Sequence, residues 1–269
     1  MPELPEVEVT RRGLAPQLSG RIITGVEVRE ARLRWPVPRE VRRLAGRTIG
    51  SITRRGKYLL VDCGDGHLIL HLGMSGSLRV AAPGTPAGKH DHVDLILGDR
   101  ILRLRDPRRF GAVLWTSGPL ERHPLLAHLG VEPLSRAFNP ARLHALARAH
   151  RTAVKQFLMD ARRIVGVGNI YASESLFRAG INPRTPANRI SMDQCRKLAP
   201  AIKQTLRAAI RAGGSSLRDF VAVNGQSGYF QNRYRVYARE GKACRRCRTP
   251  VRCIVQGQRS TFYCPRCQK

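Results

Sequence analysis

The chain begins Met1-Pro2-Glu3-Leu4-Pro5-Glu6, and the expected fold can be built outward from this stretch. Pro5 suits the first position of a helix, and Glu6 falls in the first turn, where the helix dipole favours an acidic side chain. We therefore expect a helix over residues 5–18 that ends before Gly20.

The amine in front of this helix is a candidate nucleophile. If Met1 is removed, the chain begins with the secondary amine of Pro2; an α-amino group titrates at about pH 7.7–8, so part of it is unprotonated at neutral pH. Attack on an aldehyde or a sugar C1′ would give an iminium, and the carboxyl group of Glu3 could move protons there. Many chains begin Met-Pro, however, and Pro5 also suits an ordinary helix start. The stretch alone leaves both interpretations open.

The charge of the chain indicates a polyanionic partner. Its 269 residues include 48 Lys and Arg but only 19 Asp and Glu, for a net charge of +29. This balance argues against an ordinary enzyme of small molecules and predicts salt-dependent phosphate contacts with nucleic acid. A generally basic proteome would explain several of these charges but not all of them.

The N-terminus is acidic and lacks an apolar run, so no signal peptide is visible. No segment approaches the roughly 20 apolar residues of a membrane span. The seven cysteines, an odd number, favour thiols and metal over disulfides in such a chain. We expect a cytoplasmic protein without membrane contact.

Short alternating segments separated by glycine-containing turns follow the first helix. Eight such segments at this spacing predict a β-sandwich or a barrel. The predicted strands are residues 21–29, 48–54, 57–62, 67–72, 77–80, 92–97, 100–105 and 112–115.

The apolar pattern changes to helical spacing near Gly130. Asn139 is the predicted N-cap of a helical run that extends through residue 158. Asn169 is a candidate cap for a helix over residues 170–179 that Gly180 ends. A capping box over residues 191–194 opens a further long helix.

The tail contains Cys244-x-x-Cys247 and Cys264-x-x-Cys267, which are separated by 16 residues. Each pair places two thiolates at a tight turn, and two such turns complete a tetrahedral Zn²⁺ site. Because the set has no histidine and no open position, the zinc should be structural, with a β-hairpin over residues 251–263 between the pairs. The remaining cysteines are expected not to bind metal: Cys63, Cys195 and Cys253.

These patterns together predict a multidomain α+β protein. An N-terminal β-sandwich with a flanking helix would occupy residues 1–131, and a helical DNA-binding domain would occupy 132–235. A zinc finger would occupy 236–269.

Motifs along essentially the whole chain resemble those of the formamidopyrimidine-DNA glycosylase family. They are Met1-Pro2-Glu3-Leu4-Pro5-Glu6-Val7-Glu8, Lys57-Tyr58-Leu59-Leu60, His71-Leu72-Gly73-Met74-Ser75-Gly76, Asp106-Pro107-Arg108-Arg109-Phe110-Gly111, Val167-Gly168-Asn169-Ile170-Tyr171-Ala172-Ser173-Glu174 and the four-cysteine tail. The resemblance implies a β-sandwich lobe, a helix–two-turn–helix domain and a zinc finger, with double-stranded DNA bound between lobes. It also implies excision of 8-oxoguanine and formamidopyrimidines, followed by β,δ-elimination at the abasic site. We expect the protein to act on such DNA as a monomer that associates with the nucleoid when it acts.

The resemblance assigns roles to several residues. Pro2 would attack C1′, and Glu3 would protonate the sugar ring oxygen. Glu6 would orient the N-terminus or cap the helix. Lys57 matches the proton donor of β-elimination, although a lysine also suits a phosphate anchor or an exposed strand position. Arg259 matches the arginine of δ-elimination, although a solvated hairpin charge is common.

The implied chemistry requires the damaged nucleotide to leave the duplex. By resemblance, Phe110 wedges the base stack, and Met74 and Arg108 occupy the void. Met74 lies between two glycines, where the backbone can approach DNA closely. The sequence alone, however, favours a core position for this methionine.

Further residues match DNA contacts in the family. Asn169 matches a phosphate contact at a helix start, or it serves only as the N-cap. His71 and His90 match positions near the DNA backbone but equally suit a core or a loop. Lys155 matches a family lysine, although Gln156 follows it where proline is frequent.

Two other segments bear on DNA binding. Ala149 stands where some relatives have a DNA-contacting lysine, which puts that contact in doubt. The glycine- and serine-containing loop over residues 213–228 is expected to close as a lid over the flipped base.

Two alternative functions remain open. An endonuclease VIII type would prefer oxidised pyrimidines; Leu4, in place of the glycine usual there, and the intact motif over residues 106–111 argue against it. A non-catalytic zinc-ribbon DNA-binding protein would leave Pro2, Glu3 and Lys57 without roles.

Retention of Met1, or an N-terminal tag, should abolish strand cleavage, because the nitrogen of Pro2 is then part of an amide. The measurement is the cleavage rate of an abasic-site duplex by processed and by tagged protein. Cleavage at the normal rate by a protein whose extra N-terminal residues are verified by mass spectrometry would remove Pro2 from the mechanism.

Overall fold

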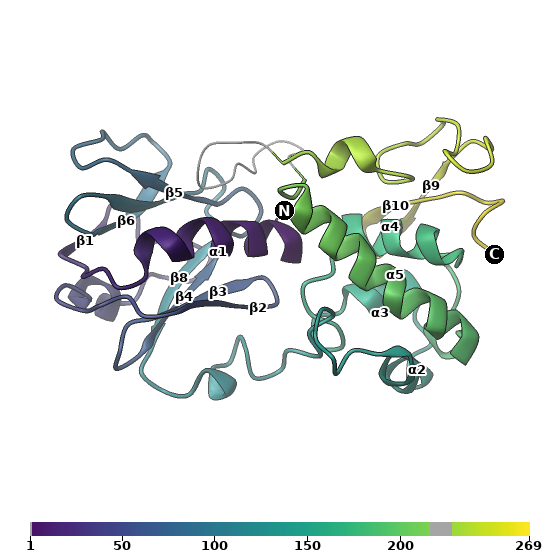
Figure 1. Cartoon of the computed structure of the whole chain (residues 1–269), viewed down its shortest axis with the longest axis horizontal. Coiled ribbons are helices and arrows are strands. Elements are labelled where there is room, and N and C mark those ends of the chain that lie inside the picture. The colour runs from purple at the N-terminus through teal and green to yellow at the C-terminus, as the bar shows by residue number, and fades with distance from the viewer. Residues whose placement is uncertain (1, 216–227) are drawn as a thin grey trace. The chain divides into compact units, whose positions relative to one another are not determined.

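In the computed structural model, which describes residues 2–215 and 228–269, the alternating segments pair into two antiparallel sheets (Figure 1). One sheet has the strand order β1-β6-β7-β5 and the other β2-β3-β4-β8. The strands are β1 (Gly25–Val28), β2 (Ile52–Arg55), β3 (Tyr58–Asp62), β4 (His67–His71), β5 (Ser77–Ala81), β6 (Asp91–Ile96), β7 (Ile101–Arg105) and β8 (Ala112–Thr116). The predicted β-sandwich is confirmed, and each predicted strand overlaps one observed strand.

A single apolar core joins both sheets and helix α1 (Leu4–Leu18). Leu14 and Leu18 from the helix, Leu59 from one sheet and Leu102 from the other all belong to it. Each such leucine contributes about 1.5–3 kcal/mol relative to an exposed position. Helix α1 begins one residue earlier than expected because Glu3 is the N-cap. Pro5 still fits there, since the first turn of a helix has no intrahelical partner for its N–H groups.

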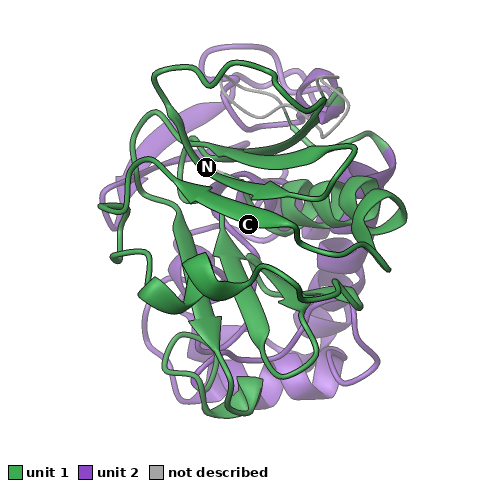
Figure 2. Ribbon diagram, turned by 90° about the vertical axis from the view of Figure 1, so that its left-hand side faces the viewer, with its two compact units in different colours: residues 1–127, 212–229 green, residues 128–211, 230–269 purple. Residues whose placement is uncertain are grey.

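The chain forms two compact units (Figure 2). The first comprises residues 1–127 and 212–229, and the second comprises residues 128–211 and 230–269. The second unit contains helices α2 (Pro140–Arg148), α3 (Val154–Met159), α4 (Asn169–Ala179) and α5 (Met192–Arg211), and the hairpin strands β9 (Arg252–Gln256) and β10 (Arg259–Tyr263). Short 3₁₀ turns lie at η1 (Arg39–Arg43) and η2 (Leu120–Arg122) in the first unit and at η3 (Ala187–Arg189) and η4 (Phe230–Arg233) in the second.

Most of the predicted helix ends are confirmed. Asn139 accepts a hydrogen bond from the Arg142 N–H and caps α2. Ser191 and Gln194 form the expected reciprocal capping box in front of α5. Gly180 ends α4 in the left-handed conformation.

Two helix predictions were wrong. The single helical run from Asn139 is split into α2 and α3, because Ala153 is extended and bridges to Pro186. Asn169 is not the N-cap of α4; Gly168 is, and Asn169 is the first helical residue.

The chain was also predicted to divide into three domains, with boundaries after residues 131 and 235. This division stays a prediction. The predicted lid falls mostly on residues 216–227, which lie outside the described residues. None of the helices that the structure describes is long and apolar enough to cross a membrane.

Candidate functional site

The start of α1 is held by a buried carboxylate. Pro2 and Glu3 are buried, and the Oε2 atom of Glu6 accepts the Glu3 N–H at 2.8 Å. The Oε1 atom of Glu6 accepts the Ser215 N–H at 2.9 Å, within the same unit. Glu6 therefore fixes the direction of the N-terminus and ties it to Ser215 of the same unit.

A second carboxylate of α1 supports the turn that carries Lys57. Glu8 accepts hydrogen bonds from Arg11 and Arg12, and Arg54 lies 3.3 Å from it. Burial raises the pKa of Glu8, but the hydrogen bonds from Arg11 and Arg12 outweigh it and lower this pKa to about 2. Arg54 also donates to the Gly56 carbonyl at 2.9 Å.

Lys57 lies in this turn between β2 and β3, not in a strand as predicted. The turn forms because Arg55 and Tyr58 are the last pair of the β2–β3 ladder, which leaves Gly56 and Lys57 between them. The lysine is half-buried at the end of the hairpin. Its position is therefore set by a rigid two-residue connection.

His71, at the end of β4, is a neutral neighbour of Lys57. Its ring lies 4.8 Å from the Tyr58 ring, and its Nδ1 accepts the Gly73 N–H at 3.0 Å. Burial, with the charges of Lys57 and Arg34, lowers the pKa of His71 to about 4. The ring is thus neutral at pH 7, and because Nδ1 is an acceptor its proton lies on Nε2.

Met74 and Phe110 come from two loops that touch. Gly73 has φ +59°, and a Cβ placed on it would lie 2.3 Å from the Phe110 carbonyl carbon, so only glycine allows this approach. Phe110 is 42% exposed, and the Arg108 guanidinium lies over its ring at 4.9 Å. Met74 is half-buried rather than in the core. The structure therefore brings all three predicted intercalating residues to one place.

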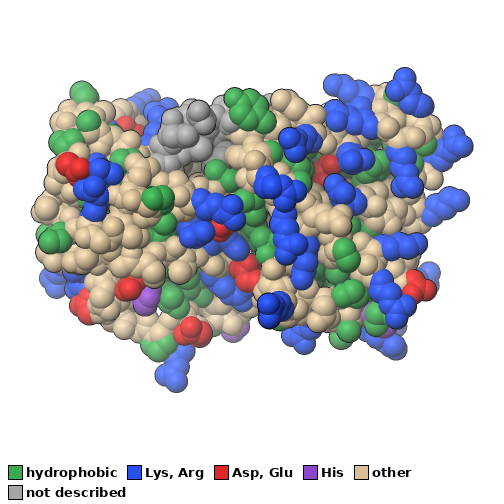
Figure 3. Space-filling model, viewed as in Figure 1, with side chains coloured by type: hydrophobic (Ala, Val, Ile, Leu, Met, Phe, Trp, Pro, Cys, Tyr) green, Lys and Arg blue, Asp and Glu red, His purple; other side chains and the backbone are tan. Residues whose placement is uncertain are grey.

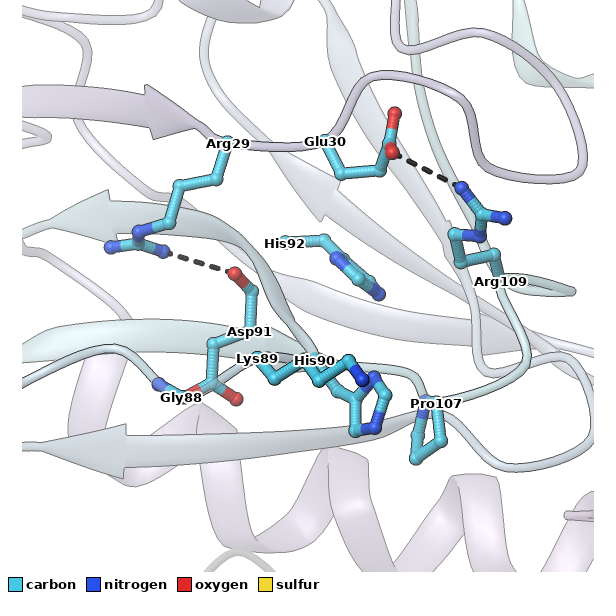
Figure 4. A pocket seen from close by; sticks show the side chains of 9 residues that line it. All are labelled: Arg29, Glu30, Gly88, Lys89, His90, Asp91, His92, Pro107 and Arg109. Carbon is cyan, nitrogen blue, oxygen red and sulfur yellow. Dashed lines mark hydrogen bonds and ion pairs between the residues drawn. The ribbon is translucent and has the colours of Figure 1, made fainter.

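His90 borders a polar cavity of about 390 Å³ in the first unit (Figure 4). Arg109, which the sequence interpretation passed over, also lines it and forms an ion pair with Glu30 at 3.1 Å. Arg109 has φ +55°, a left-handed conformation that is uncommon for arginine. The sequence feature that could have identified Arg109 is its position next to Arg108 in the motif over residues 106–111. The other lining residues are Arg29, Gly88, Lys89, Asp91, His92 and Pro107.

In the second unit, Arg259 is exposed at the start of β10, directly after the hairpin turn. The next residue, Ser260, is held through its carbonyl by Lys155 Nζ at 3.0 Å and by Asn169 Nδ2 at 3.1 Å. Lys155 Nζ also donates to the Thr261 hydroxyl at 2.6 Å. Two residues of the helical part thus fix the strand that carries Arg259.

Lys155 is buried against the zinc hairpin, and its assignment as a direct DNA contact stays a prediction. The side chain is 1% exposed, and its ammonium group lies against the hairpin. A buried lysine needs such partners because desolvation penalises its charge. The contacts of Lys155 with Ser260 and Thr261 therefore give it a role in holding the hairpin.

The Sγ atoms of Cys244, Cys247, Cys264 and Cys267 all lie within 4.8 Å of one another. The pairs Cys247–Cys264 and Cys244–Cys267 are 3.4 and 4.0 Å apart. A tetrahedral Zn²⁺ with bonds of about 2.3 Å requires sulfur separations of roughly 3.8 Å, so the four thiolates fit one structural zinc ion.

The other cysteines lie outside this cluster, as predicted. Cys63 and Cys195 are buried, and burial raises the pKa of each thiol to about 11. Cys253 is half-buried on β9.

Lys and Arg side chains gather over the second unit, on the right-hand side of Figure 3, where few acidic side chains are visible. This surface suits a polyanionic partner.

The chain was compared with known proteins. Residues 1–113 match the formamidopyrimidine-DNA glycosylase N-terminal domain, residues 129–221 match the H2TH domain of that enzyme, and residues 241–269 match a zinc finger found in FPG and IleRS. The formamidopyrimidine-DNA glycosylase of Methylococcus capsulatus is 59% identical over the full length of both chains.

Solved structures of Lactococcus lactis Fpg are also similar. A complex of that protein with DNA containing an abasic site has a TM-score of 0.91 at 34% identity, covering 99% of each chain. A complex of the wild-type protein with N7-benzyl-Fapy-dG DNA has a TM-score of 0.92 at 34% identity, covering 100% of each chain.

Acid should destabilise the first unit through His71. The folded-state pKa is about 4 and the unfolded value is about 6.5, so between these values the unfolded chain binds a proton that the folded chain excludes. The contribution of His71 to the free energy of unfolding is therefore fully present above pH 6.5 and falls as the pH drops toward 4, by on the order of 3 kcal/mol. His71→Asn keeps an acceptor for the Gly73 N–H but has no titrating ring, so its free energy of unfolding should fall less between pH 6.5 and 4. Denaturant unfolding at a series of pH values measures the free energy of unfolding of both proteins. An equal dependence on pH in the two proteins would contradict the role of His71.

Loss of a zinc ligand should cost DNA affinity, because a finger of this kind folds only around its metal. Cys264→Ser should lose bound zinc and bind a DNA duplex more weakly, whereas the matched variant Cys253→Ser should keep both. Metal analysis and fluorescence anisotropy give the two readouts. Unchanged binding by a Cys264→Ser protein that is verified to be zinc-free would refute the role of the metal.

Proposed function

The chain belongs to the formamidopyrimidine-DNA glycosylase family, and on this premise we propose that it is a bifunctional DNA glycosylase and abasic-site lyase of base excision repair. Its substrates are 8-oxoguanine and formamidopyrimidines in double-stranded DNA. The observation that carries the proposal is the full-length match to a relative that bears this enzyme's name. The solved relatives that hold abasic-site and Fapy-dG DNA support the substrate class.

The first step is a displacement at C1′ of the damaged nucleotide. The lone pair of the Pro2 nitrogen forms a bond to C1′, the bond from C1′ to the base breaks, and the base departs with that electron pair. The base takes up the proton that the Pro2 nitrogen gives up. Glu3 supplies a proton to the sugar ring oxygen, so the ring opens and a C1′ iminium remains on Pro2. The buried contact from Glu6 to the Glu3 N–H supports this assignment, since it holds the two reacting groups in one direction.

The iminium then drives strand cleavage. It acidifies the C2′ proton, and loss of that proton expels the 3′ phosphate in β-elimination; a second elimination expels the 5′ phosphate. We assign proton transfer in the first elimination to Lys57 and in the second to Arg259. Hydrolysis of the iminium by water returns the free Pro2 amine.

Access to C1′ requires the nucleotide to be extruded. We assign the wedge to Phe110, whose exposed ring is braced by Arg108, and the filling of the void to Met74 and Arg108.

Contacts with phosphate groups hold the DNA backbone. We assign them to His71, through its Nε2–H, to His90 and to the N-terminus of α4 with Asn169. Lys155 acts through the hairpin: it holds Ser260, and thereby Arg259. The zinc ion supplies no chemistry of its own and stabilises the hairpin.

We further propose that the protein acts as a monomer in the cytoplasm, associated with the nucleoid during repair. Its working parts are the β-sandwich of residues 1–131, the helix–two-turn–helix domain of 132–235 and the zinc finger of 236–269.

Borohydride reduction should trap a covalent protein–DNA adduct on a duplex that contains 8-oxoguanine opposite cytosine, because the Pro2 iminium is reducible. Glu3→Gln should lower base excision by about 10²–10⁴-fold, the range for a lost general acid. Exposed Glu121 at η2 offers a matched control as Glu121→Gln, which should cleave normally.

A parallel reaction on a thymine-glycol duplex tests the substrate class. Trapping chiefly on thymine glycol would favour the endonuclease VIII type instead. Absence of an adduct on both duplexes would show that the protein is not a lyase and would leave DNA binding alone.

A further inference from the structure

Asp106 lies directly after β7 and is fully buried, and its carboxylate collects donors from two loops. Its Oδ1 atom accepts the Ser75 hydroxyl at 2.7 Å and the Arg108 N–H at 3.3 Å. Its Oδ2 atom accepts the Gly111 N–H at 2.7 Å. No step of the proposed reaction uses this group.

The backbone of Asp106 is fixed as firmly as its side chain. Its N–H donates to the His90 carbonyl at 2.9 Å, and its carbonyl lies 2.8 Å from Nε2 of buried His92. His92 sits where the β6–β7 register shifts between Asp91 and Val93, and such a bulge re-aims a side chain. The carboxylate is therefore held in one position from both sides.

The donors of this carboxylate flank the intercalating residues. Ser75 follows Met74 in one loop, and Arg108 and Gly111 enclose Phe110 in the other. A Cβ on Gly111 would lie 3.0 Å from Oδ2 and 2.9 Å from the His71 carbonyl, so the loop closes tightly onto the carboxylate. One buried acid thus joins the methionine turn to the phenylalanine loop.

We propose that Asp106 is the positioning residue of the intercalating side chains, which holds Met74, Arg108 and Phe110 as one preorganised wedge. This inference rests on the proposed function. An ordered wedge enters the base stack without first losing loop entropy, so less of the interaction energy is spent when the nucleotide is extruded. An acid suits the task because a carboxylate only accepts hydrogen bonds, and both backbone partners are donors.

A purely structural role makes a different prediction. If Asp106 only supported the fold, its loss would lower stability and reduce every activity of the protein together. If it positions the wedge, its loss slows the step that opens a base pair and spares cleavage at a site that has no base to extrude.

The test compares Asp106→Asn, Ser75→Ala and the double variant with the wild-type protein. Asn keeps the size of the side chain but offers an NH₂ group to one of the donors. Ser75→Ala removes the hydroxyl that links the methionine loop to Asp106 and that also accepts the Arg108 N–H at 3.2 Å. Exposed Asp193 on α5 provides the matched control as Asp193→Asn. Thermal unfolding checks that each variant is folded.

Two single-turnover rates are measured: release of 8-oxoguanine from its pair with cytosine, and cleavage of a duplex with a preformed abasic site. Asp106→Asn should slow base release by about tenfold or more, since extrusion of a paired base costs a few kcal/mol, and slow abasic-site cleavage by less than about threefold. Because Ser75 and Asp106 bind each other and share the Arg108 N–H, the double variant should be slowed by less than the product of the two single fold-losses.

A folded Asp106→Asn protein that loses both rates in parallel, or neither, would overturn the positioning role while leaving the proposed function intact. Additive effects of the two substitutions would overturn the link through Ser75. A wild-type protein that acts on neither duplex would overturn the proposed function, and this inference with it.

Discussion

Buried carboxylates that accept hydrogen bonds from backbone N–H groups hold the loops on which this protein depends. Glu6 binds the N–H groups of Glu3 and Ser215 at the start of α1. Asp106 binds those of Arg108 and Gly111. Glu174 of α4, in the second unit, accepts the N–H groups of Arg235, Val236 and Tyr237, in the segment that leads to the zinc hairpin. An orphaned buried N–H costs roughly 1–3 kcal/mol, so each acid holds its loop in one conformation.

Acidic residues are scarce in this chain, and several of them are nevertheless buried as hydrogen-bond acceptors. With 48 basic and only 19 acidic residues, the folded chain repels itself, and a surface carboxylate would relieve that repulsion best. Several acids are buried instead, as hydrogen-bond acceptors or, like Glu8, beside arginines. The exposed cations are thereby left for phosphate groups, and binding to DNA supplies the counter-charge that the protein lacks.

Local spacing allowed much of the fold to be predicted from the sequence. Alternation located eight strands, the Asn139 and Ser191 caps located helix starts, and the paired cysteines located the zinc site. Contacts between distant segments could not be found in this way, because nothing local encodes them. The Ser75–Asp106 bond spans 31 residues and the Lys155–Thr261 bond spans 106. For that reason the sequence revealed neither the contact of Lys155 with the hairpin nor the hydrogen bond between Ser75 and Asp106.

The amine of Pro2 is the group on which the proposed chemistry depends, and its covalent product can be located directly. Protein reduced with borohydride on 8-oxoguanine DNA is digested with nuclease and protease, and the modified peptide is sequenced by mass spectrometry. We predict that the sugar remnant lies on the nitrogen of Pro2, in the peptide that begins the processed chain. A remnant on Lys57 or on any other lysine would contradict this mechanism.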